Sequence, residues 1–289
     1  MKHWSVGVDA QLKQALHIFS CIDPNDWRKK ISLAYQTIDY PRSSTRFAIL
    51  MYGVLAYVAG VSALLYKIAF IGNMGPIPTI DGSAKSPILI AATINIGLIV
   101  LFGLQHSIMA RPSFKRIWTR IVPPAAERST YLLATVAVLA VFFLFWQPMP
   151  IVLWSVESGI WATSLCVAYF AGWALLLFAT FQINHFELFG LQQVWSYFRG
   201  QTPVKIPFHK PWLYRLCRHP MQLGILIAIW STPTMTAGRL LFAVGMTAYV
   251  FVGLYFEERD LIRSFGKSYD EYRKRVPMLL PSLHWTAIR

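Results

Sequence analysis

Two short segments of the chain carry ionisable side chains directly beside long apolar runs. Arg218 and His219 precede Pro220, which opens one half of the last run. Glu257 and Glu258 follow the end of that run. Proline suits the first turn of a helix, where free N–H groups favour an anion such as a carboxylate or phosphate. Two carboxylates at a helix C-terminus instead meet the negative end of the helix dipole, at a cost of about 0.3–1 kcal/mol that a cationic partner would offset.

The two segments together would suit a ligand that carries both kinds of charge. S-adenosylmethionine has a carboxylate, an ammonium and a sulfonium, so it is one ligand that fits. The alternative is an ordinary interfacial role, in which Arg218 and Arg259 extend to lipid phosphates while the glutamates neutralise neighbouring Arg and Lys. Charge alone leaves both interpretations open.

Further polar groups stand at the ends of other apolar runs. His106 ends the second run, Glu127 and Arg128 precede the third, and Asn184 to Glu187 follow the fourth. Ionisable side chains at membrane depth are costly and usually mark function. We therefore expect these groups to belong to one functional region.

The composition places the elements that carry these groups in a membrane. Of the 289 residues, 55% are hydrophobic and only 14% are charged, and the mean hydropathy is +0.45, which lies outside the range of soluble domains. The net charge of +14 would permit nucleic-acid binding, but no groove-reading or base-stacking motif accompanies it. The three cysteines have no metal-ligand spacing. We predict an all-α, polytopic transmembrane helical bundle without a metal or a nucleic-acid partner.

Five apolar stretches approach the roughly 20 residues that a helix needs to cross a bilayer. They cover 47–66, 88–104, 130–146, 160–181 and 221–256. The last would be about 54 Å long as one helix, and a polar segment with a proline, 231–239, interrupts it. It is therefore predicted to be a C-terminal helical hairpin, which gives about six membrane helices. The hairpin returns the chain to its starting face and brings Arg218 and His219 close to Glu257 and Glu258.

The basic residues predict the orientation of these helices. With six spans, the segments 1–46, 105–129, 182–220 and 257–289 lie on one side and hold 24 of the 27 Lys and Arg residues, leaving Lys67, Lys85 and Arg239 on the other. Lys and Arg accumulate in cytoplasmic loops, so both termini are expected to be cytoplasmic. The chain divides into an interfacial N-terminal extension (1–45), helices one to four (46–217) and a C-terminal hairpin with its tail (218–289).

The C-terminal motif resembles that of a known superfamily. Arg218-His-Pro-Met-Gln-Leu-Gly224, Glu257-Glu-Arg-Asp-Leu261, Tyr269-x-x-Tyr272 and Val276-Pro277 are similar in order and spacing to the isoprenylcysteine carboxyl methyltransferases and phospholipid methyltransferases. Members of that superfamily often have Tyr where this chain has Gln222. Several also have Arg where this chain has Gly253, so a prenyl-type acceptor site is not expected here.

A second resemblance covers most of the chain from Arg46 onward. The segments Gln105-His-Ser-Ile-Met-Ala-Arg-Pro112, Ile121 to Thr130 and Asn184-His-Phe-Glu-Leu-Phe-Gly-Leu191 resemble the membrane-bound methanethiol S-methyltransferases, to which NnrU-like proteins are related. The resemblance implies that methanethiol is converted to dimethyl sulfide with S-adenosylmethionine as the methyl donor. It implies the following cofactor contacts: Tyr214, Arg218, His219, Met221, Gln222, Gly224, Glu257 and Glu258.

Transfer of a methyl group to a thiol needs alignment, a dry site and a thiolate. A simple thiol resembles free Cys, with a pKa of about 8.5, so a base or a positive field would help near pH 7. We expect His185, oriented by Glu187 or Asn184, to accept the thiol proton, with His106 as the second candidate. Asn184 and Arg128 are assigned to the substrate pocket.

Other functions remain open at this point. The acceptor could be a lipid or a prenyl-cysteine. A b-type haem protein could use His106, His185, His209 or His219 as axial ligands. A transporter would be expected to show inverted repeats and polar residues at the membrane midplane, which the sequence lacks. The expected location is a bacterial cytoplasmic membrane, with membrane lipids and a small thiol as partners, and no oligomeric state is predicted.

Overall fold

The computed structural model describes residues 43–157, 159–201 and 211–281. Residues 1–42 of the predicted N-terminal extension and His209 lie outside the described residues, whereas 43–45 already belong to the first long helix. Within these ranges the chain is helical except for one pair of short strands. Five helices are long and apolar enough to cross a membrane. They are α3 (Ser43–Ile71), α4 (Ile88–Ala110), α6 (Glu127–Phe145, with the preceding turn Pro124–Ala126), α7 (Ile160–Ile183) and α12 (Ala237–Phe265).

The C-terminal hairpin is present, but its first helix is short. Helix α11 (Pro220–Trp230) has 11 residues, about 17 Å at 1.5 Å per residue, and a membrane span needs roughly 20 residues. Strand β2 (Thr234–Thr236) follows and pairs antiparallel with β1 (Val152–Ser155). The predicted break at 231–239 is therefore correct in position, but α12 already begins at Ala237 and includes Arg239.

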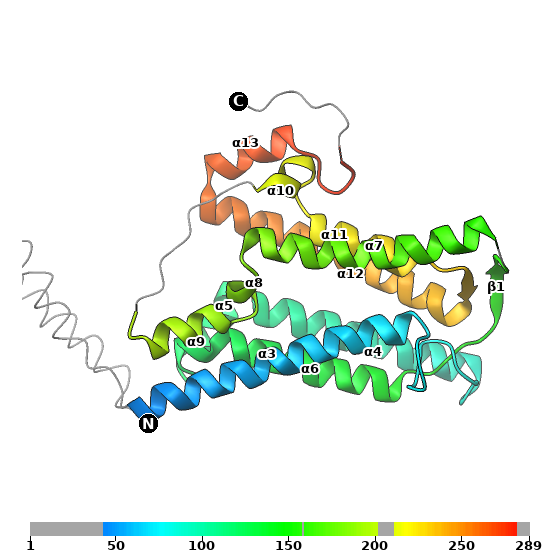
Figure 1. Ribbon diagram of the computed structural model, residues 1–289, viewed down its shortest axis with the longest axis horizontal. Coiled ribbons are helices and arrows are strands. Elements are labelled where there is room, and N and C mark those ends of the chain that lie inside the picture. Colours follow the sequence, from blue (N-terminus) through cyan, green and yellow to red (C-terminus); the bar gives the residue numbers. More distant parts are fainter. Residues whose placement is uncertain (1–42, 158, 202–210, 282–289) are drawn as a thin grey trace, which may run out of the picture.

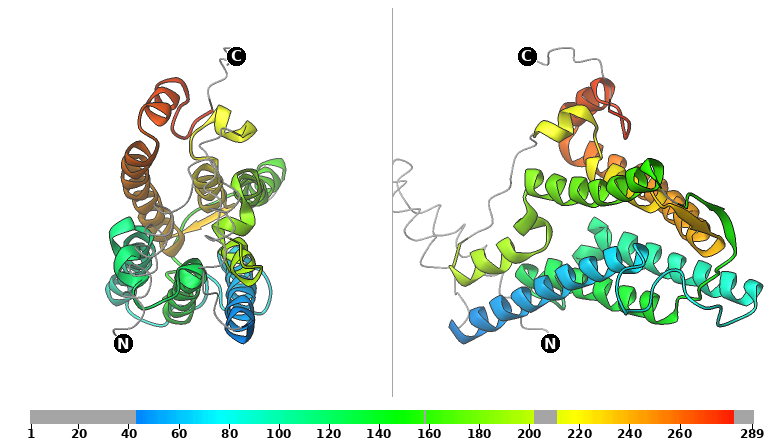
Figure 2. Two further views of the ribbon diagram at one scale, coloured as in Figure 1. Left: turned by 90° about the vertical axis from the view of Figure 1, so that its left-hand side faces the viewer. Right: turned by 45° about the vertical axis from the view of Figure 1, so that its right-hand side comes forward.

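The long helices form two layers (Figures 1 and 2). Helices α3 and α4 flank α6 in one layer, and α7 packs closely on α11 in the other, which α12 completes. Contacts between α4 and α12 join the layers. We call the end of the bundle where α7 ends and α11 begins the site end, and the opposite end, which holds β1 and β2, the strand end.

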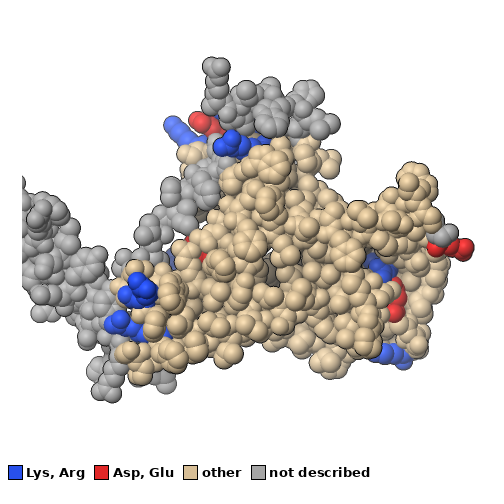
Figure 3. Space-filling model, in the orientation of Figure 1, with Lys and Arg blue, Asp and Glu red and all other residues tan. Residues whose placement is uncertain are grey.

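Short helices occupy the site end of the bundle. They are α5 (Pro112–Trp118), α8 (His185–Leu188), α9 (Leu191–Phe198), α10 (Trp212–Leu216) and α13 (Lys267–Arg275). Figure 3 shows the charged side chains on this face of the molecule confined to the two ends, with a broad uncharged belt between them. Large apolar side chains such as Leu55, Leu89 and Leu144 are exposed on the long helices, as expected for a lipid-facing surface.

Close packing is concentrated toward the strand end. The Phe142 and Trp146 rings stack with centroids 5.1 Å apart, and both meet Phe242 edge to face. Phe70 joins the same buried cluster from α3. Aromatic side chains from α3, α12 and the end of α6 thus form one buried core.

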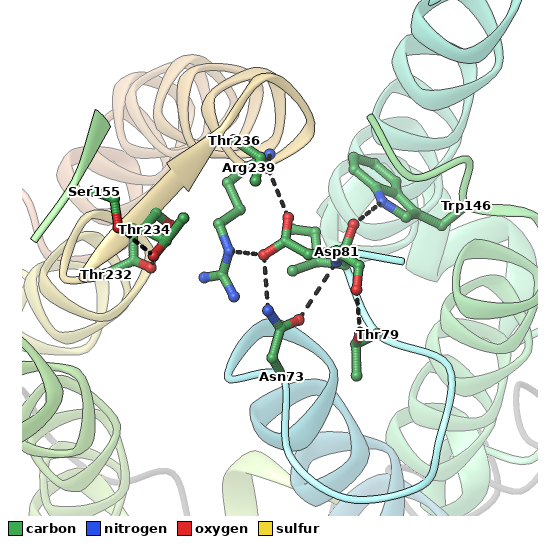
Figure 4. A network of polar contacts seen from close by, with 10 residues as sticks. Asn73, Thr79, Asp81, Trp146, Ser155, Thr232, Thr234, Thr236 and Arg239 are labelled. Carbon is green, nitrogen blue, oxygen red and sulfur yellow. Dashed lines mark hydrogen bonds and ion pairs between the residues drawn. The ribbon is translucent and has the colours of Figure 1, made fainter. Parts of the chain in front are cut away.

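A polar network ties the strand end together (Figure 4). Asp81, in the loop between α3 and α4, accepts hydrogen bonds from Asn73 at 2.8 Å and Thr236 at 2.6 Å and forms an ion pair with Arg239. Arg239 is buried, so it belongs to the interior of the bundle and not to an outer loop as the charge count assumed. The network connects the α3–α4 loop to the start of α12.

The contact between α7 and α11 depends on two glycines. A Cβ atom on Gly172 would lie 2.6 Å from the Gly224 carbonyl oxygen, and a Cβ on Gly224 would lie 2.5 Å from the Gly172 carbonyl oxygen. Small residues allow helix backbones to approach closely in membranes. Gly224, which the resemblance assigned to the cofactor, therefore has a packing role that accounts for its size.

Candidate functional site

Residues from the two ends of the hairpin meet at the site end. Arg218 Nη2 lies 2.8 Å from Glu258 Oε1, and His219 Nε2 lies 3.2 Å from the same oxygen. His219 is buried and precedes the first turn of α11, whereas Glu258 lies near the end of α12. The hairpin thus brings the two charged segments into contact, as the sequence predicts. We call this group with its neighbours Gln222 and Glu257 the charge cluster.

The two carboxylates of the charge cluster have different surroundings. The Glu258 side chain is 14% exposed and is covered by Arg218 and His219. The Glu257 side chain is 44% exposed, and it accepts a hydrogen bond from Gln222 Nε2 at 3.2 Å. Glu258 is therefore committed to internal partners, while Glu257 remains accessible to a ligand.

Several buried polar atoms around the cluster have no hydrogen-bond partner within the described part of the chain. They are Gln222 Oε1, the Tyr214 hydroxyl and Arg218 Nε. An unsatisfied buried polar group costs about 1–3 kcal/mol, so each calls for a partner that the described residues do not supply. One acceptor, one donor and one hydroxyl are available together. This set suits a ligand that offers both hydrogen-bond donors and acceptors.

The segment after α12 holds the cluster in place. Arg218 donates through Nη1 to the Arg273 carbonyl at 2.7 Å, and its backbone N–H donates to the Pro277 carbonyl at 2.9 Å. The Tyr272 hydroxyl donates to the Tyr214 carbonyl. Burial raises the pKa of both tyrosines well above the ordinary value, so they stay neutral. The Tyr and Val-Pro positions of the C-terminal motif thus have structural roles around Arg218.

Met221 lies in the first turn of α11 and is partly buried. No polar contact distinguishes it among the described residues. Its predicted contact with a cofactor stays a prediction.

His185 is held by two hydroxyl groups. Its Nδ1 lies 2.8 Å from Thr180 Oγ1 and its Nε2 lies 2.9 Å from the Tyr57 hydroxyl. The Thr180 hydroxyl donates its hydrogen bond to the Leu177 carbonyl at 2.6 Å, so its oxygen must accept a hydrogen bond from His185 Nδ1. Neutral His185 therefore carries its proton on Nδ1 and accepts from Tyr57 at Nε2.

This arrangement corrects two expectations about His185. Its orienting partners are Thr180 and Tyr57, whereas Asn184 and Glu187 bond to each other, with the Glu187 N–H donating to Asn184 Oδ1 at 3.1 Å. The ring also stacks on Phe181 at 4.2 Å and does not contact the charge cluster. Burial lowers the pKa of His185, so the ring is neutral near pH 7.

His106 occupies the interior between the layers. Its ring stacks on Phe102 at 5.4 Å and contacts Tyr131 of α6 and Tyr249 of α12. Nδ1 has a long contact of 3.5 Å with Thr135, and Nε2 has no hydrogen-bond partner among residues 43–157, 159–201 and 211–281. His106 thus has a ring nitrogen available to accept a proton, which His185 lacks.

The other predicted site residues are spread around the site end. Arg128 opens α6 beside the turn at Gly190, since a Cβ on that glycine would lie 3.0 Å from the Arg128 Cβ. Asn184 caps α8 and also donates to Gln192. None of these groups bonds to the charge cluster in the described chain, so their place in a substrate pocket stays a prediction.

Sequence reasoning missed Tyr249, Tyr57 and Thr180. Tyr249 lies two turns before Glu257 on α12. The centroids of the Tyr249 and His106 rings are 6.5 Å apart. A tyrosine in an apolar helix looks like an interfacial anchor, and nothing local distinguishes these residues. Only the packing of α3, α4, α7 and α12 reveals their neighbours.

The fold and the site define a helical membrane protein with a cluster of charged side chains at one end of its bundle. Comparison with known proteins makes this specific. Methanethiol S-methyltransferase of Mycobacterium tuberculosis (strain H37Rv) is 47% identical over 240 residues, which are 83% of this chain and 98% of that protein. Methanethiol S-methyltransferase of Pseudomonas deceptionensis is 45% identical over 243 residues, 84% and 93% of the two chains. The chain therefore belongs to the methanethiol S-methyltransferase family.

A more distant similarity extends beyond bacteria. Nurim of Xenopus laevis is 33% identical over 168 residues, 54% of this chain and 58% of that protein. No family model matches the chain. No solved structure matches it either.

Proposed function

We propose that this protein transfers a methyl group from S-adenosylmethionine to methanethiol and releases dimethyl sulfide. The relatives that carry this activity in their names align over more than four fifths of the chain. The structural observation that carries the proposal is the set of unpartnered buried polar atoms beside the accessible carboxylate of Glu257. Unpartnered donors and acceptors beside a carboxylate suit a charged, polar ligand, and a methyltransferase needs such a ligand.

The residues present fit this methyl donor. Arg218 Nε would bind its carboxylate, and Gln222 Oε1 with Glu257 would accept from its ammonium or its ribose hydroxyls. The Tyr214 hydroxyl would take either role. When bound, the sulfonium supplies the methyl group, and its sulfur keeps the electron pair of the broken carbon–sulfur bond.

We assign the thiol proton to His106 in preference to His185. Both ring nitrogens of His185 are engaged by hydroxyl groups, whereas His106 Nε2 is available and its ring contacts Tyr249. A base must reach the proton that it removes, so geometry ranks before pKa. The thiolate that remains provides the electron pair for the new carbon–sulfur bond.

The proposed topology has six membrane helices, with α11 as the short one and both termini in the cytoplasm. The positive-inside rule favours this orientation. It places the charge cluster at the cytoplasmic face, where soluble S-adenosylmethionine is available. With bacterial relatives, the cytoplasmic membrane is the proposed location, and residues 218–289 form the unit that binds the methyl donor.

The contacts disfavour His219 and His185 as haem ligands. His219 bonds to Glu258, and its other ring nitrogen lies 3.8 Å from Glu257. His185 uses both nitrogens for Tyr57 and Thr180. Neither histidine presents a free ring nitrogen to an iron.

Binding of the methyl donor tests the proposal directly. Glu257→Gln is expected to weaken S-adenosylmethionine binding by about tenfold or more, since a hydrogen bond to a charged group contributes about 1.5–3 kcal/mol. Isothermal calorimetry on purified protein measures this. Glu271→Gln, at an exposed position on α13, is the matched control and should bind normally. Equal affinities for the two variants would return Glu257 to a surface-charge role.

Turnover distinguishes the two histidines. His106→Gln should lower kcat for methanethiol by about 10²-fold or more, the usual contribution of a general base, while S-adenosylmethionine still binds. His185→Asn keeps a donor toward Thr180 and should retain most of the activity. The reverse ranking would overturn the assignment. Product analysis by mass spectrometry with isotopically labelled donor identifies the acceptor.

A further inference from the structure

Lys67 is a charged residue inside an apolar helix, and its side chain points into the bundle. It lies four residues before the strand end of α3, yet its Nζ is 5.3 Å from the centroid of the Phe102 ring. Phe102 lies 14 residues along α4 from the strand end, about 21 Å at 1.5 Å per residue. Helical side chains lean toward the helix N-terminus, which for α3 is the site end. The ammonium therefore reaches toward the middle of the bundle and not to the nearer interface.

No carboxylate in the described ranges compensates this charge. Lys67 has no hydrogen bond or ion pair there; its ammonium faces the Phe102 ring and acts electrostatically on His106. The acidic residue nearest in the chain, Asp81, is already occupied by Arg239, Thr236 and Asn73. An unpaired ammonium in apolar surroundings is costly. Its position indicates that an anion from outside the chain is its partner.

The Lys67 side chain lines a small apolar cavity between the two layers. The cavity is small: the space between its walls is about 260 Å³ even when the open solvent at its mouth is included. Apart from Lys67 the walls are apolar: Phe70, Ile71, Phe102, Leu139, Phe142, Phe143, Phe242 and Met246. A ligand of a few heavy atoms with one anionic atom and an apolar remainder fits these walls, whereas a prenyl chain or a lipid does not.

The cavity adjoins the group that we assign as the base. Phe102 contributes one face of the cavity wall, and the same residue stacks on His106 at 5.4 Å. Tyr249, which contacts both Phe102 and His106, lies one turn beyond the cavity residue Met246 toward Glu257. The charge cluster, His106 and the cavity thus follow one another along α12, from the site end toward the centre of the bundle.

We propose that this cavity is the methyl-acceptor site and that Lys67 binds the sulfur of the acceptor as a thiolate. The inference rests on the proposed function and deepens it. The thiol S–H bond breaks, its proton goes to His106 Nε2, and both bonding electrons stay on sulfur beside the ammonium. That electron pair then forms the bond to the incoming methyl carbon. The neutral thioether that results has no charge to hold it near Lys67, which favours its release, and His106 returns its proton to water.

Three variants test the role of Lys67 in the full-length protein. Lys67→Met removes the charge at nearly constant volume, Lys67→Arg keeps the charge, and Lys85→Met removes an exposed loop lysine as the matched control. The first readout is kcat/KM for methanethiol as a function of pH, with S-adenosylmethionine saturating. Lys67→Met should lower kcat/KM near pH 7 at least tenfold and move the rise in activity to higher pH. Lys67→Arg should retain a larger fraction, and Lys85→Met should match the parent protein.

The second readout needs no turnover. Methanethiol is added without the methyl donor, and ionisation of the bound thiol is followed by the ultraviolet absorbance of the thiolate. In the parent protein the bound thiol should ionise at a lower pH than free methanethiol, and Lys67→Met should abolish that difference. Calorimetry should find S-adenosylmethionine affinity unchanged within twofold. Lys67→Gln replaces Lys67→Met if the latter does not fold.

The outcomes separate this inference from the proposed function. If the parent protein methylates no thiol, the proposed function fails. If the parent protein is active while Lys67→Met keeps its kcat/KM within twofold and its thiolate titration is unchanged, the assignment of Lys67 is wrong and the function stands. Displacement of the bound thiolate signal by chloride alone, at equal concentration, would show a general anion site and would also overturn the assignment.

Discussion

At the scale of single residues, hydrogen bonding separates side chains that look equivalent in the sequence. His106 and His185 both follow apolar runs. His185 sits between Tyr57 and Thr180 with both nitrogens satisfied. His106 is surrounded by aromatic rings and keeps Nε2 available. The same chemical group therefore bridges two hydroxyl groups in one place and has a free ring nitrogen in the other, where we propose that it accepts a proton.

The bridge formed by His185 predicts a pH dependence of stability. Burial lowers the pKa of His185 in the folded state, whereas a histidine in the unfolded chain has a pKa of about 6.5. Below that pH the unfolded chain binds a proton on His185 that the folded chain does not. The contribution of neutral His185 to the free energy of unfolding is therefore fully present above about pH 6.5 and is lost as the pH falls through the folded pKa. The Tm of the parent protein should fall between about pH 7 and pH 5, and His185→Asn should fall less. Parallel curves in a thermal unfolding assay would argue against this role.

At the scale of elements, α12 connects the parts of the molecule that matter for function. Arg239 in its first turn joins the strand-end network, Met246 lines the cavity, Tyr249 contacts His106, and Glu257 and Glu258 belong to the charge cluster. These residues are spread along a single helix of 29 residues. The position of α11 relative to α12 therefore decides whether the charge cluster forms.

Helix α11 in turn depends on its contact with α7. Gly224→Ala places a Cβ against the Gly172 carbonyl and the Leu176 backbone, which forces the two helices apart at a cost of about 1–3 kcal/mol. Gly97→Ala is the control, because no atom lies within 4 Å of its Cβ position. Thermal unfolding in detergent should show a lower Tm for Gly224→Ala alone. An unchanged Tm would mean that the helices do not approach this closely.

At the scale of the whole molecule, the bundle is closed by an ion pair at the strand end and carries its polar chemistry at the site end. The Arg239 guanidinium is buried and faces Asp81. Breaking a buried pair by neutralising one partner typically costs about 3–5 kcal/mol, because a buried charge is left uncompensated. The strand-end network is thus expected to dominate the stability of that end.

Neutralising Asp81 tests this expectation. Asp81→Asn should lower the Tm markedly, while the double variant Asp81→Asn with Arg239→Met should recover part of the loss, because no buried charge then remains. Asp270→Asn, in an exposed pair with Lys274, should barely change the Tm. A double variant less stable than Asp81→Asn alone would contradict this account. The network would then contribute through its hydrogen bonds and not through charge.

The sequence predicts the helices and the charge cluster but not the interior. Apolar length and the polar break at 231–239 suffice for the spans and the hairpin, and the hairpin alone brings Arg218 to Glu258. The partners of His185 and the orientation of Lys67 depend on how α3 lies against α4 and α7. The count of basic residues assigned Lys67 to the non-cytoplasmic side, because such a count uses only the position of a residue along the chain. The direction of a side chain follows from helix packing, which spacing does not encode.

The length of α11 has a consequence for how the protein is made. A helix of 11 residues is too short to be held across a bilayer alone, since about 17 residues is the lower limit. We therefore expect α11 to enter the lipid only after α12 has been synthesised, so that the two helices insert as one unit against α7. A nascent chain that ends at Trp230 should leave this segment outside the bilayer, whereas a chain extended through Phe265 should integrate both helices and bring Arg218 to Glu258 in the same event.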